Sequence, residues 1–482
     1  MTITFHGAAR TVTGSKHLVT LEDGTKILLD CGLFQGLGDA TDDLNENFGF
    51  DPNEISFLLL SHAHIDHSGL IPKLAKDGFR GKIYCTPATR DLAEILLFDS
   101  AEIQTYEAEF INKKRLAKGL KPYEPLYTTE DVTQAMQLFE TIEYNEWLQL
   151  TNVCKALFTN AGHLIGAAAI SIHAEERTKQ VKLLYSGDVG RYRSVLLQPP
   201  SEVLEADYII LESTYGNKHH DLTFNTIEVL QKFIRQTCVQ KEGKLVIPAF
   251  SVGRTQEVLY ALNQLSLEKK LPEINYFVDS PLSTKATEVI KRYSDGFNER
   301  LQQVLKIDDD PFDFPGLKYV ASVEDSKKLV DFDSPCVIIS ASGTADAGRV
   351  RHHINSCIEQ SKNTILFVGY CGSQSLGGRL LEGEKEIEVF SEPCTVEATI
   401  DQLQGMSAHA DTNDLCKFLD SQNTENVREI FLVHGEYKVQ QEFASRLERK
   451  GFDNITIPEL HQCFTLSDKK KTPLKKAIKE DQ

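Results

Sequence analysis

The chain has 482 residues, which is too long for one ordinary hydrophobic core, so two or three domains are expected. Its hydrophobic fraction of 41% and charged fraction of 25% are typical of a globular protein, and no stretch has the apolar length of a membrane-spanning helix. The formal net charge of −18 argues against general attraction to nucleic acid. A polyanionic substrate would therefore have to meet a local basic patch or bound metal ions.

Ten cysteines are scattered along the chain without a CxxC pair. This pattern indicates reduced and mostly packed thiols rather than a disulfide framework or a cysteine-ligated zinc ion. The first residues, MTITFHGAAR, lack the charged and apolar regions of a signal peptide. We therefore expect a cytoplasmic protein.

Short apolar runs that end in a polar or small residue recur along the chain and predict strands. One aspartate or glycine after a strand is an ordinary turn residue, but six strand ends rich in Asp, His and Glu are hard to assign to turns. They indicate functional side chains at strand ends. The six predicted strands are 27–29 before Asp30, 57–60 before His62, 156–158 before His163, 181–185 before Asp188, 208–211 before Glu212, and 430–433 before His434.

Long charged stretches at 89–118 and 128–150 are predicted to be surface helices of the first domain. From about residue 213 to 391 the pattern changes to alternating strands and helices, with strands at 244–250, 276–279, 337–340 and 364–369. An amphipathic helix is predicted between the first two of these strands, over 255–265.

This middle block predicts a separate parallel-sheet domain. If His434 shares a site with His62, the block must be inserted into the first domain, because the chain returns to that domain afterwards. We expect a first domain formed by 1–212 and 392–465, an inserted domain over 213–391, and a basic tail over 466–482. The lysines of the tail predict a solvated end rather than an RNA-binding arm.

The densest group of potential metal ligands directly follows the strand predicted at 57–60 and consists of His62, His64, Asp66 and His67. Imidazole and carboxylate groups together suit borderline divalent ions such as Zn²⁺, and open α/β sheets carry their sites at the carboxyl ends of strands. Without a cation, four such side chains on one loop would repel one another or leave polar groups unpaired. The alternative is a solvated polar loop with a chance cluster of histidines.

These strand-end residues resemble the metallo-β-lactamase superfamily, and several later motifs resemble its β-CASP branch, whose members process nucleic acid. The pattern is most similar to the 3′-end-processing endonuclease of the eukaryotic cleavage complex and its prokaryotic homologues. The resemblance implies an α/β fold, a metallo-β-lactamase αββα sandwich with an inserted β-CASP parallel-sheet domain. The later motifs are 212–216 (ESTYG), 247–256 (IPAFSVGRTQ), 279–282 (DSPL), 340–349, 405–411 (GMSAHAD) and 432–436 (LVHGE).

The resemblance implies two zinc ions per chain. The first would be held by His62, His64 and His163, the second by Asp66, His67 and His434, and Asp188 would bridge both. Two ions about 3.5–4 Å apart can share a hydroxide and clamp a phosphoryl group, which agrees with this ligand set. Asp30 is expected to orient a ligand imidazole rather than to bind metal itself, and a plain turn aspartate is the alternative.

The catalytic residues that the resemblance implies are Asp66, His409 and Glu212. His409 would donate a proton to the departing 3′-oxygen, because an alkoxide is a poor leaving group, and Glu212 would hold the imidazole and favour its charged form. A packed or helix-capping histidine is the alternative for His409.

For the substrate, the histidine at position 434 favours RNA, because family members that act on DNA in eukaryotic repair tend to have an apolar residue there. The segment with Ser340, Ser342 and Gly343 resembles the family's backbone-binding loop, whose N–H groups could hold a phosphate. Arg254 and Arg379 are further candidates for phosphate contacts, with ion pairing as the alternative for both.

The resulting hypothesis is a zinc-dependent ribonuclease that cuts single-stranded RNA in a cleft between its domains, with a homodimer among the expected assemblies. The alternatives are a DNA nuclease or small phosphodiesterase of the same fold, and a non-catalytic nucleic-acid-binding scaffold. The scaffold alternative is disfavoured because every expected ligand is present. The sequence does not distinguish internal cleavage from cleavage that starts at an end.

Overall fold

The computed structural model describes residues 1–38, 40–176, 179–220, 226–369, 371–372, 374–390, 392–403 and 406–466. The chain divides into two compact units. Unit 1 comprises Met1–Tyr192, Pro199–His219 and His409–Gln482, and unit 2 comprises Arg193–Gln198 and His220–Ala408. The lysines of the predicted tail and Gly405 lie outside the described residues. None of the helices in the described ranges has the length and apolar character that crossing a membrane requires.

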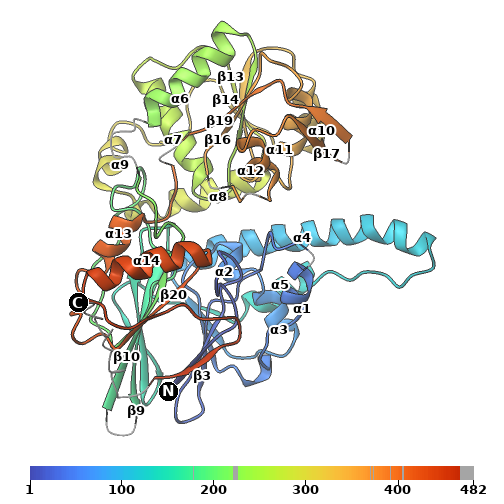
Figure 1. Cartoon of the computed structure of the whole chain (residues 1–482). Coiled ribbons are helices and arrows are strands. Elements are labelled where there is room, and N and C mark those ends of the chain that lie inside the picture. Colours follow the sequence, from blue (N-terminus) through green and yellow to red (C-terminus); the bar gives the residue numbers. More distant parts are fainter. Residues whose placement is uncertain are drawn as a thin grey trace, which may run out of the picture. The chain divides into compact units, whose positions relative to one another are not determined.

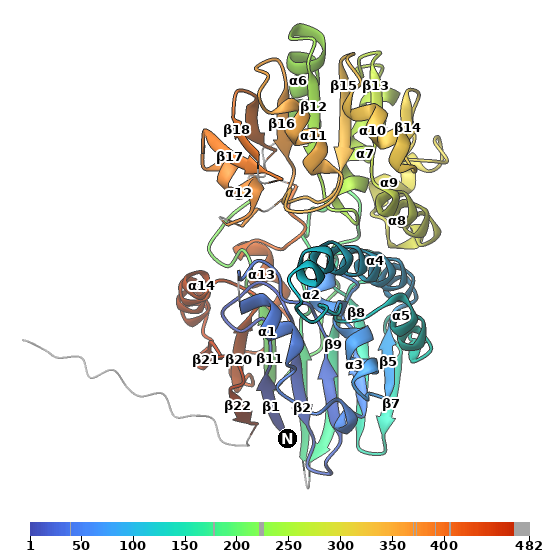
Figure 2. The same cartoon turned by 90° about the vertical axis from the view of Figure 1, so that its right-hand side faces the viewer.

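Unit 1 contains two sheets (Figures 1 and 2). The first sheet has the order β22 (Cys463–Thr465), β1 (Thr2–Phe5), β2 (His17–Thr20), β3 (Lys26–Leu29), β4 (Phe57–Leu59), β5 (Lys82–Cys85) and β6 (Phe139–Thr141). The second sheet has the order β21 (Ile455–Thr456), β20 (Glu429–Val433), β11 (Tyr208–Glu212), β10 (Lys179–Tyr185), β9 (Ala168–Glu176), β8 (Cys154–Asn160) and β7 (Trp147–Thr151).

The hydrophobic core of unit 1 lies between these sheets, because alternate residues of each strand point to opposite faces. Leu183 and Tyr185 of β10 belong to the inner core, whereas Leu184 between them packs on the outer face. There Leu184 joins apolar residues of α13 (Thr412–Phe418) and α14 (Tyr437–Arg449). Both faces of β10 are therefore covered, which explains why its sequence is nearly continuously apolar toward its end.

Other helices of unit 1 include two short ones near the ligand-rich loop and a long one that begins after β5. Figure 2 shows α3 and α5 over the outer side of the first sheet. The helices are α1 (Ala40–Glu46), a 3₁₀ turn (Pro52–Glu54), α2 (Ile65–Ser68), α3 (Ile71–Lys76), α4 (Pro87–Ala117) and α5 (Thr129–Met136).

Unit 2 is built on a sheet whose neighbouring strands all run parallel, with the order β14 (Leu317–Tyr319), β13 (Asn275–Val278), β15 (Cys336–Ser340), β12 (Lys244–Pro248), β16 (Thr364–Phe367) and β19 (Thr399–Gln402). A separate antiparallel pair consists of β17 (Glu386–Val389) and β18 (Glu392–Thr395). Its helices are α6 (Thr226–Ile234) with a π-helical continuation (Arg235–Gln240), α7 (Arg254–Leu267), α8 (Pro281–Arg292), a 3₁₀ turn (Ser294–Gly296), α9 (Glu299–Val304), α10 (Val323–Val330), α11 (Val350–Cys357) and α12 (Leu376–Leu381).

The α/β class predicted from the sequence is confirmed, with a parallel sheet in unit 2. The six strands predicted before functional residues correspond to β3, β4, β8, β10, β11 and β20, and the helix predicted over 89–118 corresponds to α4. All ten cysteines are free thiols, and eight of them are buried.

The helix predicted over 128–150 is wrong in its second half. Only α5 is helical there, and the chain continues into β6 and β7. Asn145 between these strands has φ 63°, a left-handed conformation that a helix does not admit and that asparagine tolerates well. The prediction failed because the many charged residues of this stretch obscured the alternation of apolar and polar positions that is typical of an edge strand.

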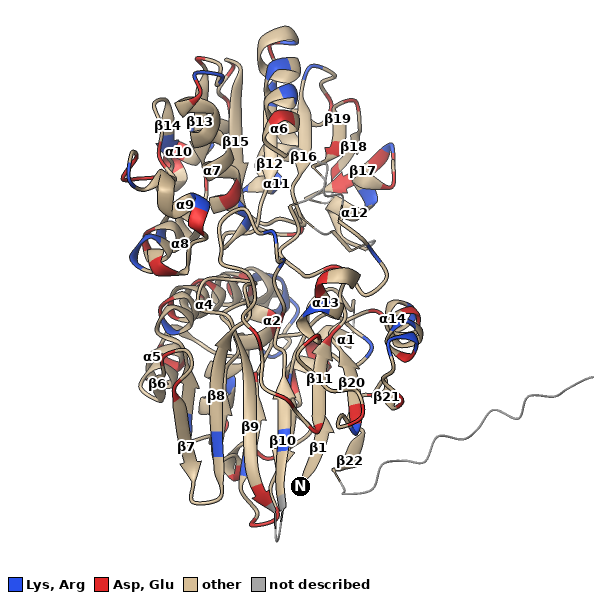
Figure 3. Cartoon of the chain, turned by 90° about the vertical axis from the view of Figure 1, so that its left-hand side faces the viewer, with Lys and Arg blue, Asp and Glu red and all other residues tan. Residues whose placement is uncertain are grey.

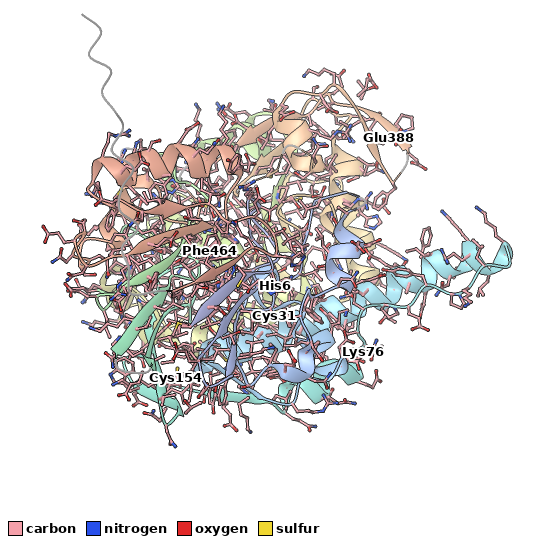
Figure 4. The ribbon with its side chains drawn as sticks, turned by 60° about the horizontal axis from the view of Figure 1, so that its bottom comes forward. His6, Cys31, Lys76, Cys154, Glu388 and Phe464 are labelled. Atoms are coloured by element: carbon pink, nitrogen blue, oxygen red, sulfur yellow. The ribbon has the colours of Figure 1, made fainter. Side chains whose placement is uncertain are left out.

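The two ends of the described chain pair with each other, because β1 runs antiparallel to β22. The ring of Phe464, labelled in Figure 4, lies 5.9 Å from the ring of Phe5 and 5.0 Å from that of Phe431. Phe5 and Phe431 belong to the inner core, so the last strand contributes an aromatic group that caps it.

We predict that Phe464→Ala lowers the free energy of unfolding by about 2 kcal/mol, because it opens a gap beside two buried rings. Denaturant unfolding followed by circular dichroism measures this change. Leu460→Ala is the matched control, since Leu460 lies in the same segment and is 37% exposed, and it should change stability by less than about 0.5 kcal/mol. Equal effects of the two substitutions would contradict the assigned role of Phe464.

Candidate metal centre

Polar side chains from both sheets of unit 1 meet where their strands end. Asp30 follows β3, and the ligand-rich loop that begins at His62 follows β4. From the second sheet, His163 follows β8, Asp188 follows β10, and His434 follows β20. The carboxyl ends of β3, β4, β10 and β20 thus supply one common site, as open sheets generally do.

The first group of potential ligands consists of His62, His64, His163 and Asp188, whose ligand atoms all lie within 4.8 Å of one another. The Nδ1 atom of His64 lies 3.2 Å from the Nε2 atoms of both His62 and His163. The Oδ2 atom of Asp188 lies 3.5 Å from the same two Nε2 atoms. Three imidazoles and a carboxylate oxygen therefore converge on one point.

The second group consists of Asp66, His67 and His434. The Nε2 atom of His434 lies 3.3 Å from Oδ2 of Asp66. The other oxygen of Asp188, Oδ1, lies 3.3 Å from Nε2 of His67 and 3.6 Å from Nδ1 of His434. Asp188 therefore presents one carboxylate oxygen to each group.

Asp30 is saturated by hydrogen bonds from the protein. Its Oδ1 atom accepts from the backbone N–H of Ser61 at 2.6 Å. Its Oδ2 atom accepts from the hydroxyls of Ser61 and Tyr185 and lies 2.6 Å from Nδ1 of His67. This arrangement fixes the ring of His67 with its Nε2 atom toward Asp188, as expected for a residue that orients a ligand.

The backbone around the ligand-rich loop is closely packed, and this packing positions α2. The N–H of Cys31 donates to the carbonyl of His67 at 2.7 Å, and the N–H of Ser15 donates to that of Asp66 at 2.8 Å. A Cβ atom at Gly32 would lie 1.6 Å from the carbonyl oxygen of Asp66, so only glycine fits there.

Two of the site residues have left-handed backbone conformations, Asp30 with φ 59° and His434 with φ 51°. Each such conformation costs about 1–3 kcal/mol for a residue other than glycine and persists only where surrounding contacts enforce it. The N–H of Asp30 donates to Leu59, and that of His434 donates to Ala8 at 2.8 Å. These bonds turn the chain sharply after the strand and direct the side chain into the site.

Three of the imidazoles and Asp188 have charge states that suit metal ligands. Burial lowers the pKa of His62 and His163 well below the ordinary value and that of His64 to about 4, which keeps these imidazoles neutral with a lone pair to offer. Burial opposes ionisation of Asp188, but the surrounding histidines outweigh it and hold the pKa of this carboxyl well below its usual range. At His67 burial would lower the pKa, but the carboxylates of Asp188 and Asp30 outweigh it and raise this pKa well above the ordinary value.

Two atoms at the centre support binding of a cation. The Nε2 atom of His67 and the Oδ1 atom of Asp188 are buried and lie 3.3 Å apart, but neither has a hydrogen bond of regular geometry to any group. Such unpaired polar atoms cost free energy in a folded protein unless something binds them. The site therefore fits divalent cations held by His62, His64 and His163 on one side, by Asp66, His67 and His434 on the other, and by Asp188 from both.

His409 and Glu212 lie beside this centre. The Nδ1 atom of His409 is 3.2 Å from Oε1 of Glu212 and 3.8 Å from Oδ2 of Asp188. Glu212 is fully buried, and its Oε1 atom also accepts from the N–H of Val189 at 2.8 Å. Burial alone would lower the pKa of His409, but the carboxylates of Glu212 and Asp188 outweigh it and raise this pKa to about 9.

The predicted substrate-binding residues belong to unit 2. Ser340 ends β15, is buried, and donates its hydroxyl to the carbonyl of Asp279, and Ser342 and Gly343 follow it. The guanidinium of Arg254 is buried and paired with Glu257, and Arg379 is paired with Glu384 on the surface. Both arginines therefore form ion pairs, which was the alternative given for them in the sequence analysis. Their contact with a substrate phosphate stays a prediction.

Sequence reasoning missed three residues that hold the site in place. Tyr185 and Ser61 both donate to Asp30, and the Oγ1 atom of Thr214 lies 3.0 Å from Nδ1 of His434. Each is adjacent or nearly adjacent to a predicted site residue along the chain. A signal was present only for Thr214, which lies in the motif that begins at Glu212, because nothing in the sequence shows that Tyr185 faces Asp30 across the core.

Comparisons with known proteins agree with this architecture. Three family profiles match consecutive parts of the chain: a metallo-beta-lactamase superfamily domain over residues 18–206, a Beta-Casp domain over 255–380, and a Zn-dependent metallo-hydrolase RNA specificity domain over 394–458. A solved structure from Enterococcus faecalis V583, described as a protein of unknown function, has the same fold with a TM-score of 0.50 and 12% identity, covering 96% of this chain and 99% of its own.

Three curated relatives span most of the chain. Ribonuclease TTHA0252 of Thermus thermophilus is 35% identical over 436 residues, covering 90% of this chain and 93% of the relative. Transcription termination factor FttA of Methanosarcina mazei is 29% identical, covering 93% and 69%. Cleavage and polyadenylation specificity factor 73 of Drosophila melanogaster is 29% identical, covering 89% and 59%.

The fold and the cluster of histidines and aspartates define a metallohydrolase. More particularly, the chain belongs to the β-CASP branch of the metallo-β-lactamase superfamily, as the resemblance predicted.

We predict that Asp188→Ala lowers the metal content per chain by at least half, because this carboxylate faces both ligand groups. Elemental analysis of protein purified without chelators measures the content. Asp420→Ala, which removes an exposed carboxylate elsewhere in unit 1, is the control and should leave it unchanged. Full metal content in the Asp188 variant would show that this residue is not a ligand.

Proposed function

We propose that the chain is a ribonuclease that hydrolyses phosphodiester bonds of single-stranded RNA with two zinc ions. His62, His64 and His163 would hold one ion, Asp66, His67 and His434 the other, and Asp188 would bridge them. Both the identity of the metal and the number of ions are part of this proposal.

The observation that carries the proposal is the position of Asp188. Its two carboxylate oxygens face different groups of imidazoles, Oδ2 toward His62 and His163 and Oδ1 toward His67 and His434. A single metal site would need only one of these oxygens. Two bound ions supply a metal-activated water and a clamp for the phosphoryl group that is attacked.

The protein's own acid would be His409. Its Nδ1 atom is oriented by Glu212, whose carboxylate is in turn fixed by N–H groups of Val189 and Thr214. The backbone of His409 pairs antiparallel with that of Gly190, which follows Asp188 by two residues in the sequence. This pairing holds His409 beside Asp188. In this position the imidazolium would donate its proton to the departing 3′-oxygen of the RNA.

RNA as substrate rests on two supports. First, the relatives include a ribonuclease, and the family profile that matches 394–458 is that of an RNA specificity domain. The residue at 434 is a histidine, as expected for RNA-directed members. Because Figure 3 shows acidic and basic positions mixed over the helices of both units, the metal ions would supply much of the local attraction for phosphate.

As substrate contacts we propose Ser340, Ser342 and Gly343, whose loop follows β15. As location we propose the cytoplasm, because ten free cysteines suit a reducing compartment.

We predict that His409→Ala retains its metal but cleaves RNA about 10²–10⁴-fold more slowly, the usual contribution of a positioned general acid. His434→Ala should instead lose metal, and His461→Ala, which removes an exposed histidine, should change neither quantity. Cleavage rates and elemental analysis of the three variants distinguish these cases. Loss of metal from the His409 variant would make His409 a ligand and leave the acid unassigned.

We also predict that the unmodified protein cuts single-stranded RNA in preference to duplex RNA and to DNA of the same sequence. Chelation should abolish cleavage, and zinc should restore it. Using end-labelled linear RNA and its circular counterpart together separates internal from end-dependent cleavage. Equal cleavage of RNA and single-stranded DNA with the same metal dependence would contradict the proposed specificity for RNA. The chain would then be a general phosphodiesterase.

A further inference from the structure

The parallel sheet of unit 2 has a topological switch point between its neighbouring strands β12 and β15. From β12 the chain passes through α7 to β13, which lies beyond β15 in the sheet. From β15 it passes through α11 to β16, which lies beyond β12 on the other side. Because such connections are right-handed, these two cover opposite faces of the sheet. Open α/β sheets bind their ligands at the carboxyl ends of the strands at such a point.

The carboxyl end of β12 carries an exposed aromatic ring. Phe250 follows this strand by two residues and is 40% exposed, although most of the strand before it is buried. A Cβ atom at Gly343 would lie 2.7 Å from the ring, and one at Gly369 would lie 3.3 Å from it, so the ring packs against the backbone of two glycines. The N–H and the hydroxyl of Thr255 both donate to the carbonyl of Phe250 and fix this turn. A ring that is held in this way can stack on a base.

The loop that follows β15 offers main-chain donors beside this ring. The hydroxyl of Ser340 donates to the carbonyl of Asp279 at 2.8 Å, and that of Ser342 donates to a carbonyl within the loop at 3.2 Å. These two hydroxyl protons are therefore already engaged. Within the described ranges, the N–H groups of Gly343 and Thr344 donate to no acceptor. Successive unpaired N–H groups are suited to binding the oxygens of a phosphate.

Asp279 holds both ends of this loop. Its carbonyl accepts from Ser340 at the start of the loop, and its Oδ1 atom accepts from Nη1 of Arg349 at the end, at 2.7 Å. Its Oδ2 atom accepts from the hydroxyl of Ser326 at 2.6 Å and lies 2.7 Å from Nε2 of His353. Burial opposes ionisation of Asp279, but these hydrogen bonds outweigh it and hold the pKa of its carboxyl below the ordinary value. The loop is thus fixed before a ligand binds, which reduces the cost of ordering it.

We propose that this switch point is a subsite for one nucleotide of a single RNA strand, whose base stacks on Phe250 and whose phosphate is held by the N–H groups of Gly343 and Thr344. Stacking and phosphate contacts do not distinguish the four bases, so the subsite holds the strand without reading its sequence. Asp279 is a positioning residue, because it acts through the loop. The inference rests on the proposed function, since it names contacts of the same substrate.

Phe390, a second exposed phenylalanine of unit 2, differs from Phe250 in its surroundings. Phe390 is 41% exposed, but its ring lies 4.6 Å from that of His352 and 4.3 Å from the guanidinium of Arg351. In the part of the chain that the structure describes, neither a ring nor a cation stacks on Phe250. Exposure alone therefore does not single out Phe250, whereas its open ring and the adjacent donors do.

Phe250→Leu tests the stacking contact, because leucine keeps an apolar side chain against the glycines but has no aromatic face. Fluorescence anisotropy measures the binding of single-stranded RNA to variants made in the His409→Ala protein, which is expected to cleave slowly. Phe250→Leu should weaken binding about tenfold, and Phe250→Tyr should not. Phe390→Leu is the matched control and should leave the affinity unchanged. Unchanged affinity in the Phe250→Leu variant overturns the proposal.

A strand of the same length without bases separates stacking from a structural effect. This abasic strand keeps its phosphates, so Phe250→Leu should weaken its binding by less than about twofold, because the ring and the base act as a pair. If the substitution weakens the binding of RNA and of the abasic strand by the same factor, the ring does not stack on a base and the proposal is wrong.

Arg349→Gln tests the positioning of the loop and should weaken the binding of RNA and of the abasic strand alike, because it loosens the phosphate contacts. Ser322→Ala removes the N-terminal cap of α10 elsewhere in unit 2 and is the control for general destabilisation. It should lower the melting temperature without changing either affinity. Equal losses of affinity in the two variants would contradict the positioning role of Asp279.

Cleavage by the parent protein separates this inference from the proposed function. A protein that binds RNA through Phe250 but does not cut it contradicts the proposed function and leaves the subsite standing. A protein that cuts RNA with the same KM whether residue 250 is phenylalanine or leucine contradicts the subsite and leaves the function standing. Displacement of the bound RNA by an equal concentration of AMP would assign the subsite to a free nucleotide and overturn the proposal.

Discussion

The carboxylate of Asp188 is the group around which unit 1 is organised. It is 2% exposed, yet histidines from the ends of β4, β8 and β20 all lie within 3.6 Å of its oxygens. Burying so many polar groups is costly unless each finds a partner, and the two sheets supply the partners only when their strand ends meet. The apolar core between the two sheets keeps these strand ends in place.

A second layer of contacts determines where the histidines point. Asp30 receives four polar groups, and Glu212 receives two N–H groups in addition to the imidazole of His409. These contacts tie the carboxylates of Asp30 and Glu212 to neighbouring protein groups, whereas the carboxylate of Asp188 faces both groups of potential ligands. The distinction depends on the number of donors around each carboxylate, and residue type alone does not reveal it.

The sequence carried enough information for much of this arrangement. Runs such as 208–211 and 430–433 are short and continuously apolar, as buried strands are, and the residues that follow them are of ligand type. The metal-binding and catalytic roles stay predictions, whereas the positions of the residues are now known. Contacts across the core, such as that of Tyr185 with Asp30, depend on sheet order, which no local pattern specifies. The helix predicted over 128–150 was wrong at residues 139–150 for a related reason. A half-exposed edge strand carries charged residues, as a surface helix does.

The order of residues along the chain has a consequence for biosynthesis. His62 and Asp188 are made early, whereas His409, His434 and the strand β22 that pairs with β1 come from the last segment. At about 5–20 residues per second, a ribosome needs roughly 10–40 s to pass from the end of the second segment of unit 1 to His434. During that time the edge of β1 is unpaired and the ring of Phe5 lacks its cover. A nascent chain in this state has every residue of the two ligand groups except His434 and an open sheet edge, so the interval exposes it both to misplaced metal and to aggregation.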